Sequence, residues 1–367
     1  MGPRTRKLAA VVTAAGLVMA QPAAAQQTPA SGPIPPKVDE RRAVVNDTQA
    51  PPANITYSIK NACVGTLNDG GVVLPNKPWG QQQLRIEEAH AFATGKNQVV
   101  AVIDTGVRNH QYFNGRVIKG PDYVAKPADA LQDCDGHGTE VAGIIAARSP
   151  DSRQVGFTGV APDARILAIR QSSENYKGTP APTADNPNPQ ETTAGDLNTL
   201  AQAVRHAADR EEVTVINMSV DNCRLATFAI SEPEKDLQRA LRYAVQNDKV
   251  VVASAGNQSQ VCTEPLNGPD SKQPKFIITP PWFADDVLSV AAVDRKGNLA
   301  GFSMQGPWVS VAAPGTDIIS LDPAGTLANR TVQGGKNVAI QGTSFAAPYV
   351  AGLAALVRER FPNLNAR

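Results

Sequence analysis

Six short apolar runs, spaced along most of the chain, constrain its fold more than any other feature. The first, "QVVAVIDTG", occupies residues 98–106 and has five consecutive apolar residues before Asp104. The other runs have the same character and read "ARILAIR", "EVTVINMSV", "KVVVASAGN", "DVLSVAAV" and "WVSVAAPG". A short continuous apolar run of this kind is typical of a strand that is buried on both faces, as in a parallel sheet.

Helical patterns separate several of these runs. We interpret "HGTEVAGIIAA" at residues 137–147 as a helix, together with residues 196–209 and 235–247. Residues 81–94, which precede the first run, are also expected to be helical. Strands that alternate with helices form βαβ units with right-handed crossovers. The sequence therefore predicts an α/β fold in which helices cover both faces of a mostly parallel sheet.

Segments outside this pattern differ in composition. Residues 26–80 are rich in Pro, Gly, Asn and Asp, so we expect an extension that wraps around a larger domain at 81–367. Residues 172–195, "SSENYKGTPAPTADNPNPQETTAG", are polar and Pro-rich and are expected to form a long exposed loop. Residues 260–280 form a second irregular segment.

The first 25 residues have the pattern of an export signal. Three basic residues precede the apolar stretch 8–20, and Ala23 and Ala25 form an A-x-A cleavage pattern before Gln26. The apolar stretch is too short to span a bilayer comfortably, and an uncleaved anchor is the alternative interpretation. We therefore expect a signal peptide at residues 1–25 and an exported protein.

Charge and cysteine content narrow the class of protein further. The formal net charge of +1 provides no basic field that would attract nucleic acid. An even number of cysteines in an exported chain favours disulfides over thiolate metal sites. The four residues permit three pairings and are Cys63, Cys134, Cys223 and Cys262.

Polar residues follow several expected strands at their carboxyl ends, where ligands bind in an open α/β sheet. Asp104 follows the first run, residues 217–220 follow "VTVI", and Asn257 follows "VVVASAG". Because the carboxyl ends of parallel strands meet at one edge, these groups are expected to gather at a single rim of the sheet.

Two further residues stand at expected helix starts, where free N–H groups and the macrodipole favour developing negative charge. Ser344 lies in "GTSFAAPYVAGLAALVRERF" and becomes a nucleophile only if a base takes its proton. His137 can be that base, and Asp104 can fix its tautomer and stabilise its positive form. Taken singly, the three residues have structural alternatives as a turn cap, a structural histidine and a helix N-cap.

The stretch "DCDGHGTE" at residues 133–140 has a second interpretation as a metal site. Cys134, Asp135, His137 and Glu140 are all possible ligands. A catalytic zinc ion normally has three protein ligands, and the sequence offers no further ligand set to support a metallohydrolase. We therefore expect no metal and no other cofactor.

The order Asp, His, Ser along the chain is one of those known for catalytic triads, with subtilisin as an example. Five stretches of this chain resemble, in the same order, blocks of the subtilisin-like serine proteases. They are "VAVIDTGV", "GHGTEVAGIIAA", "VINMSV", "VVVASAGN" and "GTSFAAPYVAG". The resemblance covers residues 81–367. It implies a three-layer subtilisin-like fold and a serine endopeptidase that acts on extended polypeptide.

The resemblance implies a role for each matching residue. Asp104 resembles the orienting carboxylate, His137 the general base and acid, and Ser344 the nucleophile. Asn257 resembles the side-chain donor of the oxyanion hole, which the backbone N–H of Ser344 completes.

Substrate binding is implied for a second group of residues. Ser219, Val220 and Asp221 resemble the edge segment along which substrate pairs as an extra strand, and Gly256 belongs to the same substrate-binding set. Asp221 departs from the glycine of many relatives, and its side chain is expected either to narrow the cleft or to repel acidic substrate residues. Glu140 departs from the second histidine of the family's H-G-T-H block.

The export signal, Pro-rich extension, cysteine placement and polar insertion resemble those of mycosins, the subtilisin-like proteases of actinobacterial type VII secretion systems. This implies a polypeptide substrate, a partner in the secretion membrane complex, and a place in the cell envelope on the periplasmic side of the membrane, or secretion. Mycosins continue beyond the point matching Arg367 into a transmembrane helix. We therefore expect a C-terminally incomplete domain whose membrane association requires an anchor absent from this chain.

A disulfide pairing follows from the expected topology. The strands "VTVINMSV" and "VVVASAGN" are linked by one helix and should be neighbours, which brings Cys223 close to Cys262. The remaining bond, Cys63–Cys134, would fasten the extension beside His137.

The alternative function is a scaffold with the subtilisin-like fold. Such a protein would stabilise a secretion complex while its active site is occluded or dispensable. The complete set of Asp, His and Ser residues favours the protease.

Overall fold

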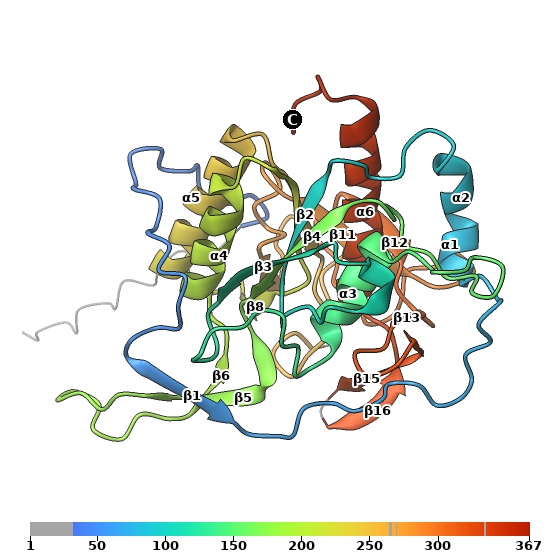
Figure 1. Cartoon of the computed structure of the whole chain (residues 1–367). Helices are drawn as coiled ribbons and strands as arrows, with labels where there is room; N and C mark the ends of the chain where they lie inside the picture. The colour runs from blue at the N-terminus through green and yellow to red at the C-terminus, as the bar shows by residue number, and fades with distance from the viewer. Residues whose placement is uncertain (1–31, 264–265, 269, 334) are drawn as a thin grey trace, which may run out of the picture.

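The computed structural model describes residues 32–263, 266–268, 270–333 and 335–367, so the expected signal peptide lies outside the described residues. A central parallel sheet separates two layers of helices, as the sequence predicts (Figure 1). From edge to edge the strands are β12 (Val311–Pro314), β11 (Leu288–Val293), β9 (Val250–Ser254), β7 (Val213–Met218), β2 (Val99–Asp104), β4 (Arg165–Arg170) and β3 (Val117–Asp122).

The sheet buries both of its faces, which explains the uninterrupted apolar runs. On one face, Val100 and Val102 pack with α3 (His137–Ala146) and α6 (Thr343–Arg360). On the other, Val99, Ala101 and Ile103 pack with α4 (Leu197–Asp209) and α5 (Glu232–Gln246). Alternate residues of β2 thus face opposite helical layers.

The six predicted strands are present, and the sheet has a seventh, β3, that the sequence pattern did not reveal. β3 reads "VIKGPD" and has only two consecutive apolar residues. It lies at the edge of the sheet beside β4, and four of its six residues are only partly buried or exposed. An edge strand with polar positions lacks the apolar signature of a central one.

Two helix predictions need correction. The predicted helix at 81–94 is replaced by two short ones, α1 (Trp79–Gln83) and α2 (Ile86–Ala89), because Arg85 takes the left-handed conformation with φ of 52°. Helix α5 begins at Glu232 rather than at the predicted residue 235. Its start is fixed by Ser231, whose hydroxyl accepts the backbone N–H of Glu234 in a capping box.

The polar insertion at 172–195 is not simply a loop. β5 (Ser173–Pro180) pairs with β6 (Thr192–Ala194) and also with β1 (Ile55–Ile59) of the N-terminal extension, both in antiparallel fashion. The expectation of an exposed loop therefore holds only for the residues between β5 and β6. Periodicity within the insertion could not reveal β5, since its partner lies more than 100 residues earlier in the chain.

The N-terminal extension runs around the larger domain (Figure 1). Near its start it lies against α5, where Arg42 Nε donates to Asp236 at 2.6 Å. Further along, the Asp47 carboxylate bonds Nδ1 of His206 in α4 at 2.8 Å and the Tyr123 hydroxyl at 2.6 Å. These widely spaced anchors account for an ordered segment that has few apolar residues.

The remaining strands form small antiparallel pairs around the central sheet. They are β8 (Asn222–Leu225) with β10 (Phe276–Thr279), β13 (Ser320–Leu321) with β14 (Leu327–Ala328), and β15 (Arg330–Gln333) with β16 (Lys336–Ala339), and one 3₁₀ turn spans Gln111–Phe113. Across the described ranges, no helix is both long and apolar enough to cross a membrane.

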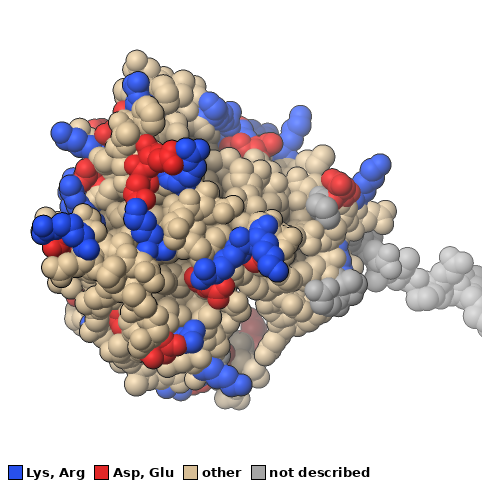
Figure 2. All heavy atoms as spheres, turned by 90° about the vertical axis from the view of Figure 1, so that its right-hand side faces the viewer, with Lys and Arg blue, Asp and Glu red and all other residues tan. Residues whose placement is uncertain are grey.

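Charges of both signs are interspersed on the face shown in Figure 2. Most of that face carries uncharged residues, and basic side chains often lie next to acidic ones. This distribution agrees with the net charge of +1 and offers no extended basic surface on this side.

Candidate active site

The carboxylate of Asp104 and the imidazole of His137 meet at the carboxyl end of β2. Nδ1 of His137 lies 2.7 Å from Oδ1 of Asp104. The Asp104 side chain is fully buried, whereas 25% of the His137 side chain is exposed. A carboxylate held against Nδ1 keeps the proton on that nitrogen and leaves Nε2 free to accept another.

The pKa of His137 depends on this pairing. Burial by itself lowers the pKa, because the charged imidazolium loses hydration. The negative charge and hydrogen bond of Asp104 outweigh that effect and raise the pKa above its ordinary value. His137 is therefore a stronger base than an isolated imidazole.

The loop that precedes His137 is organised by the buried carboxylate of Asp133. It accepts hydrogen bonds from the Thr105 hydroxyl at 2.9 Å and the backbone N–H of Gly136 at 2.8 Å. It also accepts both the backbone N–H and the hydroxyl of Thr139, at 2.8 and 2.6 Å. Asp133 thus joins the end of β2 to the first turn of α3 and holds the backbone on both sides of His137.

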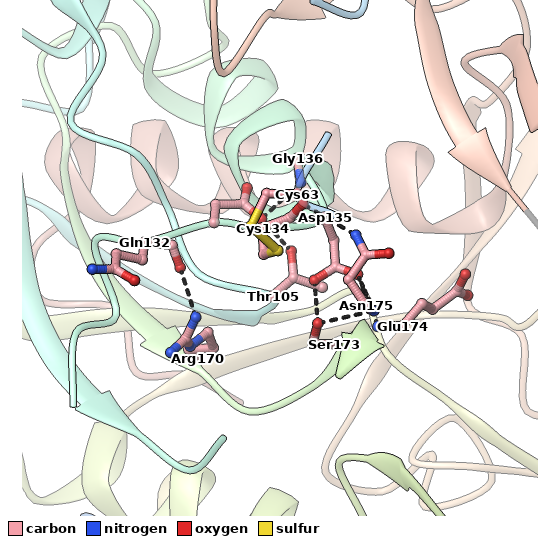
Figure 3. The surroundings of a disulfide bond; sticks show 11 residues. Cys63, Thr105, Gln132, Cys134, Asp135, Gly136, Arg170, Ser173, Glu174 and Asn175 are labelled. Atoms are coloured by element: carbon pink, nitrogen blue, oxygen red, sulfur yellow. Dashed lines mark hydrogen bonds between the residues drawn. A yellow bond between two sulfur atoms is a disulfide. The ribbon is translucent and has the colours of Figure 1, made fainter. Parts of the chain in front are cut away.

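The second carboxylate of "DCDGHGTE" also accepts hydrogen bonds from the protein (Figure 3). Asp135 accepts the Ser173 hydroxyl and the backbone N–H groups of Glu174 and Asn175, the latter two at 2.8 and 3.0 Å. The side-chain amide of Asn175 donates to the Cys134 carbonyl at 3.1 Å. These bonds tie the loop before α3 to strand β5.

The disulfides join Cys63 to Cys134 and Cys223 to Cys262. Residues just after Cys63 pack on Gly136, where an added Cβ would lie 2.9 Å from Leu67 and 3.0 Å from Val64. Gly136 also has a φ of 85°, which favours glycine. The extension therefore contacts the residue immediately before His137.

Ser344 lies in the first turn of α6. Its hydroxyl donates to the Ser219 carbonyl at 3.2 Å, and the Ser219 hydroxyl donates to the Ser344 carbonyl at 2.7 Å. Within the described residues, the Ser344 hydroxyl makes no hydrogen bond to His137. The ring centroids of His137 and Phe345 are 5.0 Å apart, so the imidazole lies against the start of α6. The structure thus brings the three expected catalytic residues to one rim.

The amide of Asn257 is held in a defined orientation. Its Oδ1 accepts the backbone N–H of Thr343 at 2.9 Å and the Thr343 hydroxyl at 3.1 Å. Because the backbone N–H can only donate, the amide oxygen must face Thr343, and Nδ2 remains available as a donor. The Thr343 hydroxyl also accepts the backbone N–H of Gly256 at 3.2 Å, which links the segment after β9 to the start of α6.

The expected substrate-binding residues lie at the same rim. Ser219 is buried against Ser344, Val220 is half-buried, and Asp221 is exposed. Oδ1 of Asp221 lies 3.4 Å from the position that a Cβ on Gly256 would occupy. Segments 219–221 and 256–257 follow neighbouring strands, since β7 pairs with β9.

Glu140 is a buried acid one helical turn beyond His137. The residue is fully inaccessible to solvent, and its carboxyl group lies near Thr331 without a well-formed hydrogen bond to either oxygen. Burial raises its pKa well above the ordinary value, which favours the uncharged acid. Sequence reasoning identified Glu140 as a departure from the family but did not predict its burial.

The metal interpretation of "DCDGHGTE" does not agree with this geometry. Cys134 is in a disulfide, His137 pairs with Asp104, and Asp135 is used in hydrogen bonds to β5. Within the ranges that the structure describes, no group of three or more His, Cys, Asp and Glu side chains is placed to hold a metal ion. The sequence analysis did not predict that Asp133 holds the loop before His137. The one sequence feature that could have indicated this role is the position of Asp133 three residues before Gly136, whose backbone N–H it accepts.

Comparison with known proteins agrees with the geometry. The sequence pattern described as "Subtilase family" matches residues 95–367. Mycosin-1 of Mycobacterium tuberculosis is 40% identical over 353 residues, which cover 92% of this chain and 76% of that protein. Mycosin-4 of the same organism is 40% identical over 337 residues, which cover 91% of this chain and 71% of the relative.

Solved structures give the same result. The serine protease MycP1, described as an essential component of the type VII (ESX-1) secretion system, superposes with a TM-score of 0.79 and 37% identity over 90% of each chain. A chain from an intact ESX-5 inner membrane complex superposes with a TM-score of 0.78 and 34% identity, covering 90% of this chain and 80% of its own. The chain therefore belongs to the subtilase family of serine proteases and, within it, to the mycosins.

Proposed function

We propose that this subtilase hydrolyses peptide bonds with Asp104, His137 and Ser344 as its catalytic triad, and that it works in the cell envelope with a type VII secretion system. The observation that carries the catalytic part is the 2.7 Å contact between His137 Nδ1 and Asp104 Oδ1, at the rim where Ser344 begins α6.

The first chemical step starts with rotation of the Ser344 hydroxyl away from the Ser219 carbonyl and toward His137. Nε2 of His137 takes the proton as Oγ of Ser344 attacks the substrate carbonyl carbon. The resulting imidazolium is stabilised by Asp104, which keeps its own negative charge. When the tetrahedral intermediate collapses, the leaving amine takes that proton and an acyl-enzyme remains. A water molecule then repeats the sequence and releases the acid.

Negative charge on the substrate oxygen requires donors fixed in advance. Nδ2 of Asn257 is available because Oδ1 is held by Thr343. The backbone N–H of Ser344 lies in the first turn of α6, where it has no partner within the helix. These two groups are the proposed oxyanion hole.

Substrate is proposed to bind in an extended conformation along segment 219–221. Backbone pairing of this kind recognises a main chain first and side chains second. The interlocking hydrogen bonds between Ser219 and Ser344 support this, because they hold the segment directly against the proposed nucleophile.

The partner and location are proposed from the relatives. Structures similar to this chain come from the ESX-5 inner membrane complex and from its periplasmic assembly. We place this protein correspondingly on the periplasmic side of an actinobacterial inner membrane, bound to the secretion complex.

A scaffold role is the second candidate. It is favoured by the extension, which is fastened by the Cys63–Cys134 disulfide and packs on the residue before His137. A scaffold needs the bound extension but does not need the serine.

Hydrolysis of an unstructured protein such as casein tests the catalytic proposal, with wild type compared to Ser344→Ala and Asp185→Asn. Asp185 lies exposed between β5 and β6, so its variant should match wild type. We expect Ser344→Ala to lose activity by about 10⁶-fold. Equal activity of wild type and Ser344→Ala would contradict the proposal, and an inactive wild-type protein would favour the scaffold.

A further inference from the structure

Asp221 places a carboxylate at the entrance to the proposed catalytic centre. It comes two residues after Ser219, which exchanges hydrogen bonds with Ser344. Oδ1 of Asp221 lies 3.4 Å from the Cβ position of Gly256, the residue before Asn257. The carboxylate thus lies close to the segment that carries the proposed oxyanion donor.

The backbone around Asp221 is held from two directions. Asn222 begins strand β8, which pairs with β10, and Cys223 is bonded to Cys262 on the chain that follows Asn257. Ile278 of β10 and Met304 are fully buried and lie beside the same Cβ position of Gly256. The Asp221 carboxylate and these two apolar side chains therefore border the same side of Gly256.

No positive group of the described residues neutralises this carboxylate. Asp221 is exposed, yet it takes part in no hydrogen bond or ion pair within the part of the chain that the structure describes. A carboxylate without a partner in the protein is free to form an ion pair with a cation that arrives with a ligand.

The proposed chemistry fixes which substrate residue comes near Asp221. The scissile carbonyl oxygen must reach Asn257 and the N–H of Ser344. The side chain on the same residue can then extend toward segments 219–221 and 256–257, which lie against the start of α6. A lysine or arginine there can lay its methylene stem along Gly256 and bring its charge to Asp221.

We propose that Asp221 is a specificity-determining residue, which selects a lysine or arginine immediately before the scissile bond. This inference rests on the proposed catalytic function, since the position of the side chain follows from the position of the reacting carbonyl.

Internally quenched peptides that differ at one residue test the inference. Lysine is compared with norleucine, which has a stem of similar length and no charge. We expect wild type to cleave the lysine peptide with at least a tenfold higher kcat/KM and to cut directly after the lysine, as mapped by mass spectrometry. Asp221→Asn should reduce the lysine-to-norleucine ratio about tenfold, Asp221→Glu should largely keep it, and Asp221→Lys should invert it.

Asp185→Asn is the matched control, because it removes an exposed carboxylate from another part of the chain and should leave the ratio unchanged. A ratio that is the same in wild type and Asp221→Asn would overturn the inference. So would an Asp221→Gly variant that cleaves both peptides faster by the same factor, because that result shows a carboxylate that only narrows the cleft.

Binding separates this inference from the catalytic proposal. Calorimetry with the Ser344→Ala variant measures the Kd of the same two peptides without turnover. Tighter binding of the lysine peptide, lost in Ser344→Ala/Asp221→Asn, supports the inference even if wild type hydrolyses nothing. Equal Kd values for the two peptides would overturn it.

Discussion

Asp133 accepts both the backbone N–H and the hydroxyl of Thr139, so a single buried carboxylate closes the first turn of the helix that carries His137. The position of His137 depends on this residue, although Asp133 makes no hydrogen bond to Asp104, His137 or Ser344.

Replacing Asp133 should therefore destabilise the fold. Asp133→Ala leaves the N–H groups of Gly136 and Thr139 and the hydroxyl of Thr105 without their acceptor. Unsatisfied buried groups cost about 1–3 kcal/mol each, so we expect the free energy of unfolding to fall by roughly 3 kcal/mol or more. Urea denaturation measures it. Asp151→Ala, at a surface turn, should change stability far less, and equal effects would argue against a bracing role.

Strands could be predicted from the sequence where burial on both faces leaves a continuous apolar run. Strand β2 is buried on both faces, so "VVAVI" marks it without knowledge of its neighbours. Strands β5 and β6 could not be found this way, because β5 is ordered by pairing with the distant strand β1. The break at Arg85 was equally hidden, since a left-handed residue in a helical pattern has no apolar signature.

In the candidate site, too, some residues could be proposed from the sequence, whereas the roles of others depend on the folded structure. Asp104, His137 and Ser344 could be proposed from the sequence because triad chemistry requires these residue types, and they stand beside glycines or at expected helix starts. The supporting role of Asp133 depends on the folded path of the loop around it. The burial of Glu140 depends on packing of α3 against the remainder of the domain, which no local pattern records.

Glu140 should make stability depend on pH. Its folded-state pKa lies well above the ordinary value of about 4.5, so the folded protein keeps a proton that the unfolded chain releases as pH rises. Stability is then lost with increasing pH above about 4.5, by as much as about 1.4 kcal/mol per pH unit. Glu140→Gln cannot release a proton, so its stability relative to wild type should rise as the pH increases above about 4.5.

Urea unfolding of both proteins across this pH range provides the measurement. Any effect of the amide itself on the stability of Glu140→Gln is a constant offset that does not vary with pH. The exposed Glu174→Gln variant serves as the control and should show no such trend. A constant difference between Glu140→Gln and wild type would mean that Glu140 is already charged in the folded protein.

Asp104 should control both the rate and its pH dependence. Asp104 raises the pKa of His137, and the base works only when it has lost its proton. The acidic limb of kcat/KM is therefore expected above the ordinary histidine value of about 6.5. Asp104→Asn should move this limb to lower pH, because burial then dominates, and should reduce kcat by about 10⁴-fold. An unmoved limb would show that another group sets it.

Active-site labelling tests the central claim most directly. A fluorophosphonate probe reacts with a serine only when a base and an oxyanion hole activate it, and the labelled peptide can be identified by tandem mass spectrometry. We predict a single adduct on Ser344 in the wild-type protein and none in Ser344→Ala or His137→Ala. Labelling that persists in Ser344→Ala, or an adduct on any other residue, would contradict the account.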